Sequence, residues 1–369
     1  MKLIYLTAKK YPGSTADHNY ILNLARAFFK EFGQNFSFVA CNTNLQDLHD
    51  IPLVNVLIPN LLKRTFVFFF WIPWYWFNNI HKDLDTGKRV IFFSNDLNLL
   101  SILIFWKRLL NLPIIIVADW HYWSGSWKDI FVFKNSNYSV VTSDKLKRAI
   151  SHVSPLSNIQ TIYGGVSLEQ YEAVDNLKQV RLQLGLPLHK FLIGYIGLFR
   201  SLGIDKGISM MIDSLEYLDP DNIMVFVGGK NNEIDNYKKY AETKQLTDRC
   251  IFIPLQIFEK VVLYEKVMDI LVIPYPDHPH FRDIGFPMKI YEYMAANVPI
   301  VYTQLGLVEE IVTDCAYGIK PDNPLELAKI ISFIKLNPDD VKKKKLLAFE
   351  KVKKLSWADK AKSIIAVFK

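Results

Sequence analysis

Short apolar runs alternate with amphipathic stretches along the first half of the chain. Between the apolar runs, residues 21–33 and 97–111 place apolar side chains at helical spacing, and the first of these stretches ends at a glycine. A strand, a loop, a helix and a second strand at the N-terminus indicate a Rossmann-like sheet. The apolar runs typical of buried strands occupy residues 2–8, 36–42, 89–96 and 112–118.

The second half repeats this alternation after a polar, charged segment at about residues 167–188, which we interpret as a linker. Residues 190–215 are predicted to form a strand, a glycine-containing loop and a helix, and further strands are predicted at 222–232 and 269–275. A chain of 369 residues is long enough for two domains with separate cores. The predicted fold class is therefore α/β, with two Rossmann-like domains of parallel strands.

Residues 284–303 are predicted to form a loop, a helix and a strand that together bind a ligand. Gly285 lets a ligand approach the backbone, and Pro287 fits the first position of a helix, where its missing N–H costs nothing. In α/β units of this kind, ligands bind beyond the carboxyl ends of the strands, and the free N–H groups of a helix start attract phosphate.

Three cations and one acid extend this prediction. On the helix after Pro287, Lys289 and Glu292 lie three positions apart and share one face. Arg200 and Lys206 are separated by a glycine-containing loop, so both side chains can converge on one diphosphate. The alternative interpretation is that Arg200 and Lys206 are two solvated surface cations.

His121 follows directly after the apolar run that ends near residue 118. A single histidine is often structural. Its place at the carboxyl end of a predicted strand makes His121 a candidate site residue.

Residues 61–82 have the most unusual composition of the chain. Trp, Tyr and Phe surround Pro73, and Lys63, Arg64 and Lys82 lie at the margins. A segment that lies in a membrane interface has this composition. A helix packed on the core of a large α/β domain is the alternative, and periodicity does not separate the two.

Composition narrows the class of protein further. Half of the residues are hydrophobic and 14% are aromatic, which excludes disordered and fibrous proteins. The net charge of +7 indicates an anionic partner, and phosphate, lipid and nucleic acid all qualify. The three scattered cysteines are typical of a reducing compartment and give no zinc-ligand spacing. We expect no secretory signal in the first residues and no spanning helix, because no run of eighteen apolar residues is present.

Nearly the whole chain resembles GT-B glycosyltransferases, in particular family 4, and the resemblance is most specific between residues 190 and 312. The resemblance rests on two motifs, Arg200 with Lys206 and the run IGFPMKIYEYMAANVP at 284–299. The resemblance implies that Glu292 holds the ribose of a sugar nucleotide and that Arg200 and Lys206 neutralise its diphosphate and act in catalysis. It implies further donor contacts from Asp283, Gly285, Phe286, Pro287, Met288 and Lys289, a contact of Gly13 with the ligand, and a catalytic position for His121 beside the reacting sugar.

Two positions depart from the family pattern. The family has a first glutamate eight residues before the second, where this chain has Ile284, with Asp283 next to it. The first loop of the family usually carries paired glycines, and only Gly13 is present here. Both departures concern the sugar end of the donor more than the diphosphate.

The resemblance also implies a domain organisation and a reaction. Residues 1–168 are expected to form the acceptor-side domain, residues 169–345 the nucleotide-sugar domain, and residues 346–369 a helix that crosses back to the first domain. The two domains are expected to face each other across a cleft. The implied reaction is transfer of a sugar, with retention of configuration, from a UDP- or GDP-sugar to a glycan or lipid-linked saccharide in surface glycoconjugate synthesis.

We expect no cofactor and no metal, because no Asp-x-Asp pair follows a strand and the cations can stabilise the leaving diphosphate. The expected location is the cytoplasm, at the inner face of an anionic membrane, bound through residues 61–82 and the ten lysines after residue 340. A non-catalytic GT-B subunit and a nucleotide-sugar epimerase are the alternatives. Nucleic-acid binding has no motif to support it.

Overall fold

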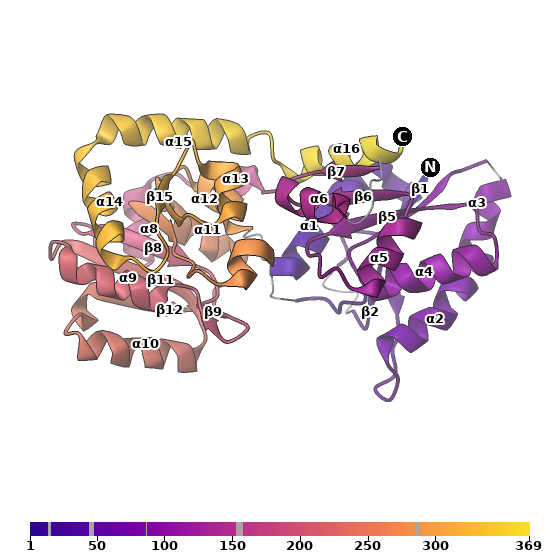
Figure 1. Cartoon of the computed structure of the whole chain (residues 1–369), viewed down its shortest axis with the longest axis horizontal. Coiled ribbons are helices and arrows are strands. Elements are labelled where there is room, and N and C mark those ends of the chain that lie inside the picture. Colours follow the sequence, from indigo (N-terminus) through magenta and orange to yellow (C-terminus); the bar gives the residue numbers. More distant parts are fainter. Residues whose placement is uncertain (14–15, 44–47, 86, 153–157, 285–287) are drawn as a thin grey trace. The chain divides into compact units, whose positions relative to one another are not determined.

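The structure is a computed structural model, and it describes residues 1–369 except 14–15, 44–47, 86, 153–157 and 285–287 (Figure 1). Contacts divide the chain into two compact units. Unit 1 consists of Met1–Gly165 and Trp357–Lys369, and unit 2 consists of Val166–Ser356. Each unit is built on its own parallel sheet.

Unit 1 contains, in its described residues, a seven-stranded parallel sheet with the order β3-β2-β1-β4-β5-β6-β7. The strands are β1 (Lys2–Leu6), β2 (Phe36–Cys41), β3 (Leu53–Val56), β4 (Val90–Ser94), β5 (Ile114–Trp120), β6 (Tyr138–Val141) and β7 (Ile159–Thr161). The helices are α1 (Ala16–Phe32), η1 (Gly33–Asn35), α2 (Arg64–Tyr75), the π-helix η3 (Trp76–Ile80), α3 (His81–Asp85), α4 (Leu97–Leu109), α5 (Trp127–Asn135), α6 (Asp144–Ser151) and α16 (Trp357–Phe368).

Both faces of this sheet are covered, which explains why its strands are apolar runs without polar alternation. On β1, Ile4 and Leu6 join a core cluster that also holds residues of α2, α4 and α5. Tyr5 points to the other face, where its ring lies 6.1 Å from that of Phe28 on α1 and 4.9 Å from that of Phe93 on β4. Alternation of side chains along the strand divides the core into these two layers.

Unit 2 contains, in its described residues, a six-stranded parallel sheet with the order β12-β11-β8-β13-β14-β15 and a separate antiparallel hairpin. The strands are β8 (Phe191–Ile196), β9 (Arg200–Ser201), β10 (Ile204–Asp205), β11 (Asn222–Gly229), β12 (Cys250–Pro254), β13 (Ile270–Ile273), β14 (Ile300–Thr303) and β15 (Tyr317–Ile319). The helices are α7 (Leu168–Glu172), α8 (Leu177–Gln183), α9 (Ile208–Ser214), η4 (Leu215–Tyr217), α10 (Asn231–Thr243), η5 (Thr247–Arg249), α11 (Phe258–Lys266), the π-helix η6 (His280–Ile284), α12 (Lys289–Ala296), α13 (Gly306–Val312), α14 (Pro324–Leu336) and α15 (Pro338–Val352). Two parallel sheets flanked by helices confirm the predicted α/β fold class.

Three details differ from the sequence-based expectations. The polar segment 167–188 is not an open linker, because it contains α7 and α8, the latter capped by the side chain of Asn176. The loop between Arg200 and Lys206 contains the β9–β10 hairpin. The terminal segment 346–369 is not one helix, since α15 ends at Val352 in unit 2 and α16 begins at Trp357 in unit 1.

The aromatic stretch 61–82 contributes to the core through one side only. Phe68, Ile72 and Tyr75 of α2 and Trp76 and Ile80 of η3 are buried in the core cluster of unit 1. The alternative interpretation, a helix packed on the core, is therefore confirmed for this side of the stretch. Across the described residues, no helix combines the length and the apolar character that crossing a bilayer requires.

Candidate functional site

The β9–β10 hairpin sets the positions of the two predicted diphosphate cations. Arg200 pairs with Asp205 across the hairpin, and its Nε donates to the carbonyl of Gly203 at 3.0 Å, which leaves the guanidinium exposed. The N–H of Lys206 donates to the carbonyl of Phe199 at 3.0 Å. Arg200, on β9, and Lys206, directly after β10, therefore both lie at the open end of the hairpin.

The start of α9 is attached to this hairpin by the side chain of Asp205. Its Oδ1 accepts from the N–H groups of Gly207 and Ile208, each at 2.8 Å, and its Oδ2 accepts from the hydroxyl of Ser209 at 2.7 Å. Gly207 has a φ of +91°, and a Cβ there would lie 1.8 Å from the carbonyl oxygen of Pro274. Only glycine fits this close approach of α9 to the end of β13.

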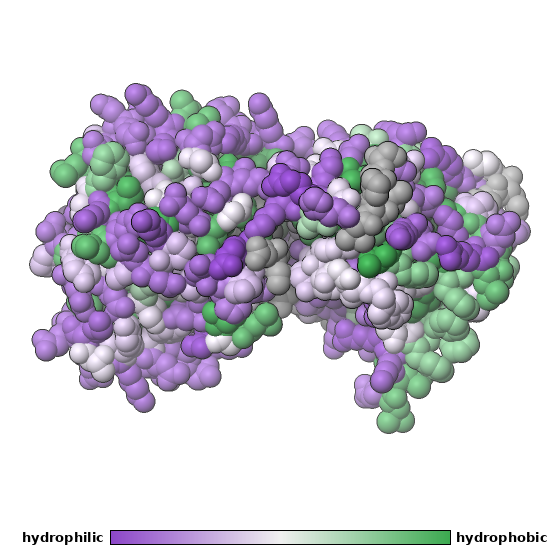
Figure 2. Space-filling model, viewed as in Figure 1, coloured by the Kyte–Doolittle hydropathy of each residue, from purple (hydrophilic) through white to green (hydrophobic). Residues whose placement is uncertain are grey.

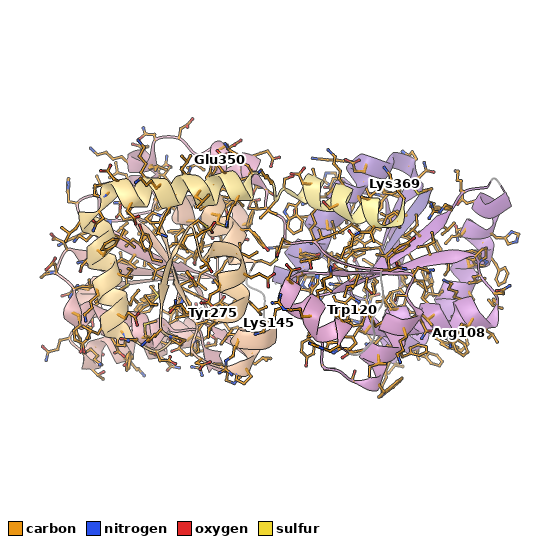
Figure 3. All side chains as sticks on the ribbon, turned by 45° about the horizontal axis from the view of Figure 1, so that its top comes forward. Arg108, Trp120, Lys145, Tyr275, Glu350 and Lys369 are labelled. Carbon is orange, nitrogen blue, oxygen red and sulfur yellow. The ribbon has the colours of Figure 1, made fainter. Side chains whose placement is uncertain are left out.

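Lys206 lies in a partly desolvated position at the carboxyl end of the sheet. Burial lowers the pKa of its ammonium to about 8, and the carboxylate of Glu233 opposes the shift. Its Nζ lies 5.9 Å from the centre of the Tyr275 ring, which follows β13 in unit 2 (Figure 3). A cation that is held in little water, with a pKa close to neutrality, interacts strongly with an incoming anion.

Lys289 is more deeply buried than Lys206 and has a different set of partners. Its Nζ donates to the carbonyl of Ile196 at 2.9 Å, at the end of β8, and lies 3.9 Å from the centre of the Tyr195 ring. Burial and the charge of Lys206 hold the pKa of Lys289 well below its ordinary value. The side chain thus lies beneath the end of β8 and anchors α12 there.

Tyr293 completes this anchor. Its hydroxyl accepts from the N–H of Ile196 at 2.9 Å and donates to the carbonyl of the same residue at 3.3 Å. Gly197 follows with a φ of +143°, and a Cβ there would lie 2.3 Å from Nζ of Lys289. The chain therefore turns at Gly197 directly over the two side chains of α12.

Glu292, the predicted ribose ligand, is partly buried in the first turn of α12. Burial raises the pKa of its carboxyl, and the nearby ammonium of Lys289 opposes that shift. Within unit 2, the structure therefore brings together Lys206, Lys289 and Glu292.

Glu265 on α11 is a second buried carboxyl next to Glu292, and no motif of the sequence points to it. Its side chain is fully buried, and its Oε2 accepts from the hydroxyl of Tyr171 on α7 at 2.6 Å. Among the described residues, Oε1 has no hydrogen-bond partner. Burial, followed by repulsion from Glu292, raises the pKa of Glu265 well above its ordinary value.

The segment that carries the rest of the predicted donor contacts is described only in part. Gly285, Phe286 and Pro287 lie outside the described residues, as do the side chains of Asp283 and Ile284. Met288 is the N-cap residue of α12. His280 of η6 is an addition to the predicted set: its Nε2 lies 3.4 Å from Oγ of Ser201 on the hairpin, and burial, His278 and Lys206 lower its pKa.

His121 lies in unit 1, immediately after β5, in a cluster of polar side chains. Its Nε2 lies 3.1 Å from Oδ2 of the buried Asp119, which also accepts from the hydroxyl of Tyr20 at 2.8 Å. Burial opposes ionisation of Asp119, but His121, Lys360 and the hydrogen bond from Tyr20 together lower its pKa. Asp119 therefore remains ionised and fixes the orientation of the His121 ring.

Gly13 also lies in unit 1. A Cβ at Gly13 would lie 2.1 Å from the ring of His18, so the imidazole covers the glycine backbone. Within the described part of the chain, no group of three or more His, Cys, Asp or Glu side chains is arranged to hold a metal ion.

Comparisons with known proteins give a family match for one part of the chain. Residues 175–350 match the model of the family "Glycosyl transferases group 1". The D-inositol 3-phosphate glycosyltransferase of Corynebacterium glutamicum is 22% identical over 243 residues, which are 62% of this chain and 56% of that protein. The D-inositol 3-phosphate glycosyltransferase of Corynebacterium diphtheriae is 19% identical over 60% of this chain and 50% of its own length. The chain thus spans about half the length of these curated relatives.

Solved structures match over the full chain. The crystal structure of Anabaena Alr3699/HepE in complex with UDP has a TM-score of 0.78 at 15% identity and covers 99% of both chains. The structure of a glycosyltransferase from Rickettsia africae has a TM-score of 0.80 at 14% identity and covers 100% of this chain and 98% of its own. At these identities the match shows the fold, and the chain has the GT-B fold.

Proposed function

We propose that the protein transfers a sugar from a nucleoside diphosphate sugar to a glycan or lipid-linked saccharide, with retention of configuration. The main support is the arrangement of Lys206, Lys289 and Glu292 at the carboxyl ends of the unit 2 strands, with Arg200 near Lys206 at the open end of the hairpin. This is the edge at which α/β sheets bind ligands. Residues 175–350 match the model of a transferase family, which agrees with this chemistry.

Charge separation is the main barrier in such a transfer. As the bond to the sugar breaks, the diphosphate gains negative charge and the sugar becomes cation-like. Arg200 and Lys206 would bind the diphosphate directly, because their side chains are the more accessible cations, while Lys289 would act from below the end of β8. A well-placed donor commonly stabilises such a leaving charge by roughly 3–4 kcal/mol.

We further propose UDP as the nucleotide, no metal and no cofactor. Structures of the HepE protein, which shares the fold, are described as complexes with UDP and with UDP-glucose. The cations of the hairpin would carry out the neutralisation for which other transferases use a divalent ion. Glu292 would hold the ribose, and His121, oriented by Asp119, would position the reacting sugar from unit 1.

The decisive experiment measures melting temperature with UDP, GDP and ADP, followed by transfer from the corresponding sugar nucleotides with and without EDTA. We expect UDP to raise the melting temperature, since a ligand that binds only the native state stabilises it. Arg200→Ala and Lys206→Ala should each lower turnover by about 10²-fold or more while the protein remains folded. Near-normal turnover in both variants would overturn the diphosphate assignment.

The same assay separates two alternatives. An epimerase would convert a UDP-sugar without an acceptor, and a non-catalytic GT-B subunit would bind UDP without transfer or hydrolysis. Lys238→Ala, on the exposed side of α10, is the matched control for removal of a cation and should leave both readouts unchanged.

We propose, finally, that the protein binds its acceptor at the inner face of a membrane. The aromatic stretch 61–82 supports this, and the C-terminal lysines support it less. Lys351 of α15 forms an ion pair with Asp314, Lys344 donates to the carbonyl of Ala316 at 3.2 Å, and Lys360 of α16 is buried. These three lysines are therefore engaged within their own units.

A further inference from the structure

One side of α2 and η3 exposes large apolar side chains that the core does not use. Phe66, Phe70, Trp74 and Phe77 have 53%, 56%, 57% and 57% of their surfaces exposed. They recur every three or four residues, so they lie along one side of the helix, opposite the buried Phe68 side. A row of four exposed aromatic rings is unusual for a surface that faces only water.

Helix α4 widens this surface, although the sequence of α4 did not predict that contribution. Phe69 links the two helices, with ring centres 5.3 Å from Phe70 and 5.4 Å from Phe105, and its carbonyl accepts from Nε1 of Trp106 at 2.7 Å. Figure 2 shows hydrophobic residues gathered over α2 and α4. We call this surface the aromatic face, and it consists of Leu61, Leu62, Phe66, Phe70, Trp74, Phe77, Phe105 and Leu109.

The two sequence segments that carry the aromatic face contain charges of one sign. Residues 51–82 and 97–112, which contain all of its members, include five Lys or Arg and no Asp or Glu. Arg64 donates to the carbonyl of Ala8, and Lys107 and Arg108 donate to asparagine side chains. These hydrogen bonds run to neutral acceptors, so they do not neutralise the charges of these three side chains. We call the five cations of the two segments the basic rim.

We propose that the aromatic face binds the surface of an anionic lipid bilayer, with its rings in the headgroup region and its basic rim against lipid phosphates. Aromatic side chains flanked by cations favour that boundary. The helical elements α2, η3 and α3 follow one another without a break, but one side of α2 and η3 is packed in the core of unit 1, so the segment lies on the bilayer and does not cross it. A second copy of the chain is a poorer occupant, because a two-fold contact brings each basic rim against another.

This inference stands on unit 1 and does not need sugar transfer to be correct. Only its consequence, the capture of a lipid-linked acceptor, rests on the proposed function. Nucleotide binding is assigned to unit 2, so UDP affinity in solution and vesicle binding are independent measurements.

Flotation of the full chain with vesicles tests the aromatic face. We expect the protein to float with phosphatidylcholine vesicles that contain phosphatidylglycerol at low salt, and to remain unbound with phosphatidylcholine alone. The double variant Phe70→Ser/Trp74→Ser should reduce the bound fraction at least about tenfold, because each exposed ring supplies apolar area. Lys63→Glu/Lys82→Glu should weaken binding to the anionic vesicles and reduce its salt dependence.

Matched controls come from unit 2. Tyr217→Ser removes an aromatic side chain that is 54% exposed, and Lys238→Glu/Lys239→Glu reverses two exposed charges; both should float like the wild type. Failure of the wild type to float at low salt would overturn the inference, as would equal losses in Tyr217→Ser and Phe70→Ser/Trp74→Ser. A wild-type dimer that Phe70→Ser/Trp74→Ser dissociates would also overturn it in favour of self-association. UDP-dependent stabilisation that persists in each case would leave the proposed nucleotide site intact.

Discussion

Lys206 is a cation whose charge depends on pH near the physiological range. Because burial lowers its pKa to about 8, the ammonium is charged below that pH and loses its proton above it. A bound diphosphate favours the charged form. UDP binding at this site is therefore linked to the uptake of a proton at alkaline pH.

We expect the affinity for UDP to fall above about pH 8, by up to about tenfold per pH unit, as Lys206 becomes neutral. Lys206→Arg keeps its charge throughout this range and should abolish the decline. Calorimetric titration at about pH 7 and about pH 9.5 measures the effect. Equal pH dependence in the wild type and in Lys206→Arg would show that another group controls binding.

The pKa shift of Glu265 is opposite in direction to that of Lys206. Its pKa is raised in the folded protein, so the native state keeps a proton that the unfolded state loses above its ordinary pKa of about 4.3. The native state then binds more protons than the unfolded state, and stability falls as pH rises through this window. The slope for one such group is up to about 1.4 kcal/mol per pH unit.

Glu265→Gln should remove this slope, because the amide has no proton to lose and can still accept from Tyr171. We expect its melting temperature to rise relative to the wild type between about pH 5 and about pH 8. Glu259→Gln, at an exposed position of α11, is the control and should follow the wild type. A constant difference across this range would contradict the assignment of the proton to Glu265.

At the scale of elements, the contact between α9 and the end of β13 keeps the hairpin next to the sheet. Gly207 and Gly203 both have positive φ, but a Cβ at Gly207 meets the carbonyl of Pro274, whereas a Cβ at Gly203 meets nothing within 4 Å. Substitution of Gly203 therefore measures the cost of a positive φ alone, and substitution of Gly207 adds the cost of the steric clash with Pro274.

Gly203→Ala should lower the free energy of unfolding by about 1–2 kcal/mol, the cost of a positive φ for alanine. Gly207→Ala should cost clearly more and weaken UDP binding, since α9 must move away from Pro274 and take the hairpin with it. Denaturant unfolding and UDP titration of the two variants measure both effects. Equal losses would mean that the close approach to Pro274 is not rigid.

Helix α16 is the other element with a clear structural role. It packs on α1, with Ala361, Ile364, Ile365 and Phe368 buried, and Arg89 donates to the carbonyl of Phe368 at 2.9 Å. Lys360 adds hydrogen bonds to the carbonyls of Ile162 and Tyr163 at 2.9 and 2.7 Å. The end of the chain is thus part of the core of unit 1.

Ile364→Ala should lower the stability of unit 1 by about 2–4 kcal/mol, because it opens a cavity between α16 and α1. Lys362→Ala, on the exposed side of the same helix, should change it by less than about 0.5 kcal/mol. Calorimetry with and without UDP provides the readout. We expect the transition that UDP stabilises to be unaffected by Ile364→Ala, and a shift of that transition would show that the two units unfold together.

At the scale of the whole molecule, the sequence was informative where structure is local. The strands β1, β4, β8 and β13 are continuous apolar runs because both faces of each sheet are covered, and this pattern is readable without coordinates. The spacing of Arg200, Lys206 and Glu292 in motifs led to their selection as site residues, and their roles stay a prediction.

Features that depend on tertiary packing could not be predicted from the sequence. Glu265 looks like any charged residue of an amphipathic helix, and only the packing of α7, α11 and α12 buries it. The hairpin β9–β10 has strands of two residues each, too short to produce a pattern. The stretch 61–82 was ambiguous for a physical reason, since one side of α2 is in the core and the other is in solvent.

The position of α16 has a consequence for how the protein is made. Residues 357–369 leave the ribosome only after all of unit 2 has been synthesised, yet they cover part of the core of unit 1. Unit 1 therefore waits, with the α16-facing surface of α1 uncovered, while 191 further residues, Val166–Ser356, are translated and fold. A nascent chain, or one terminated before residue 357, presents that surface to chaperones and proteases, so synthesis of α16 removes a vulnerable surface from unit 1.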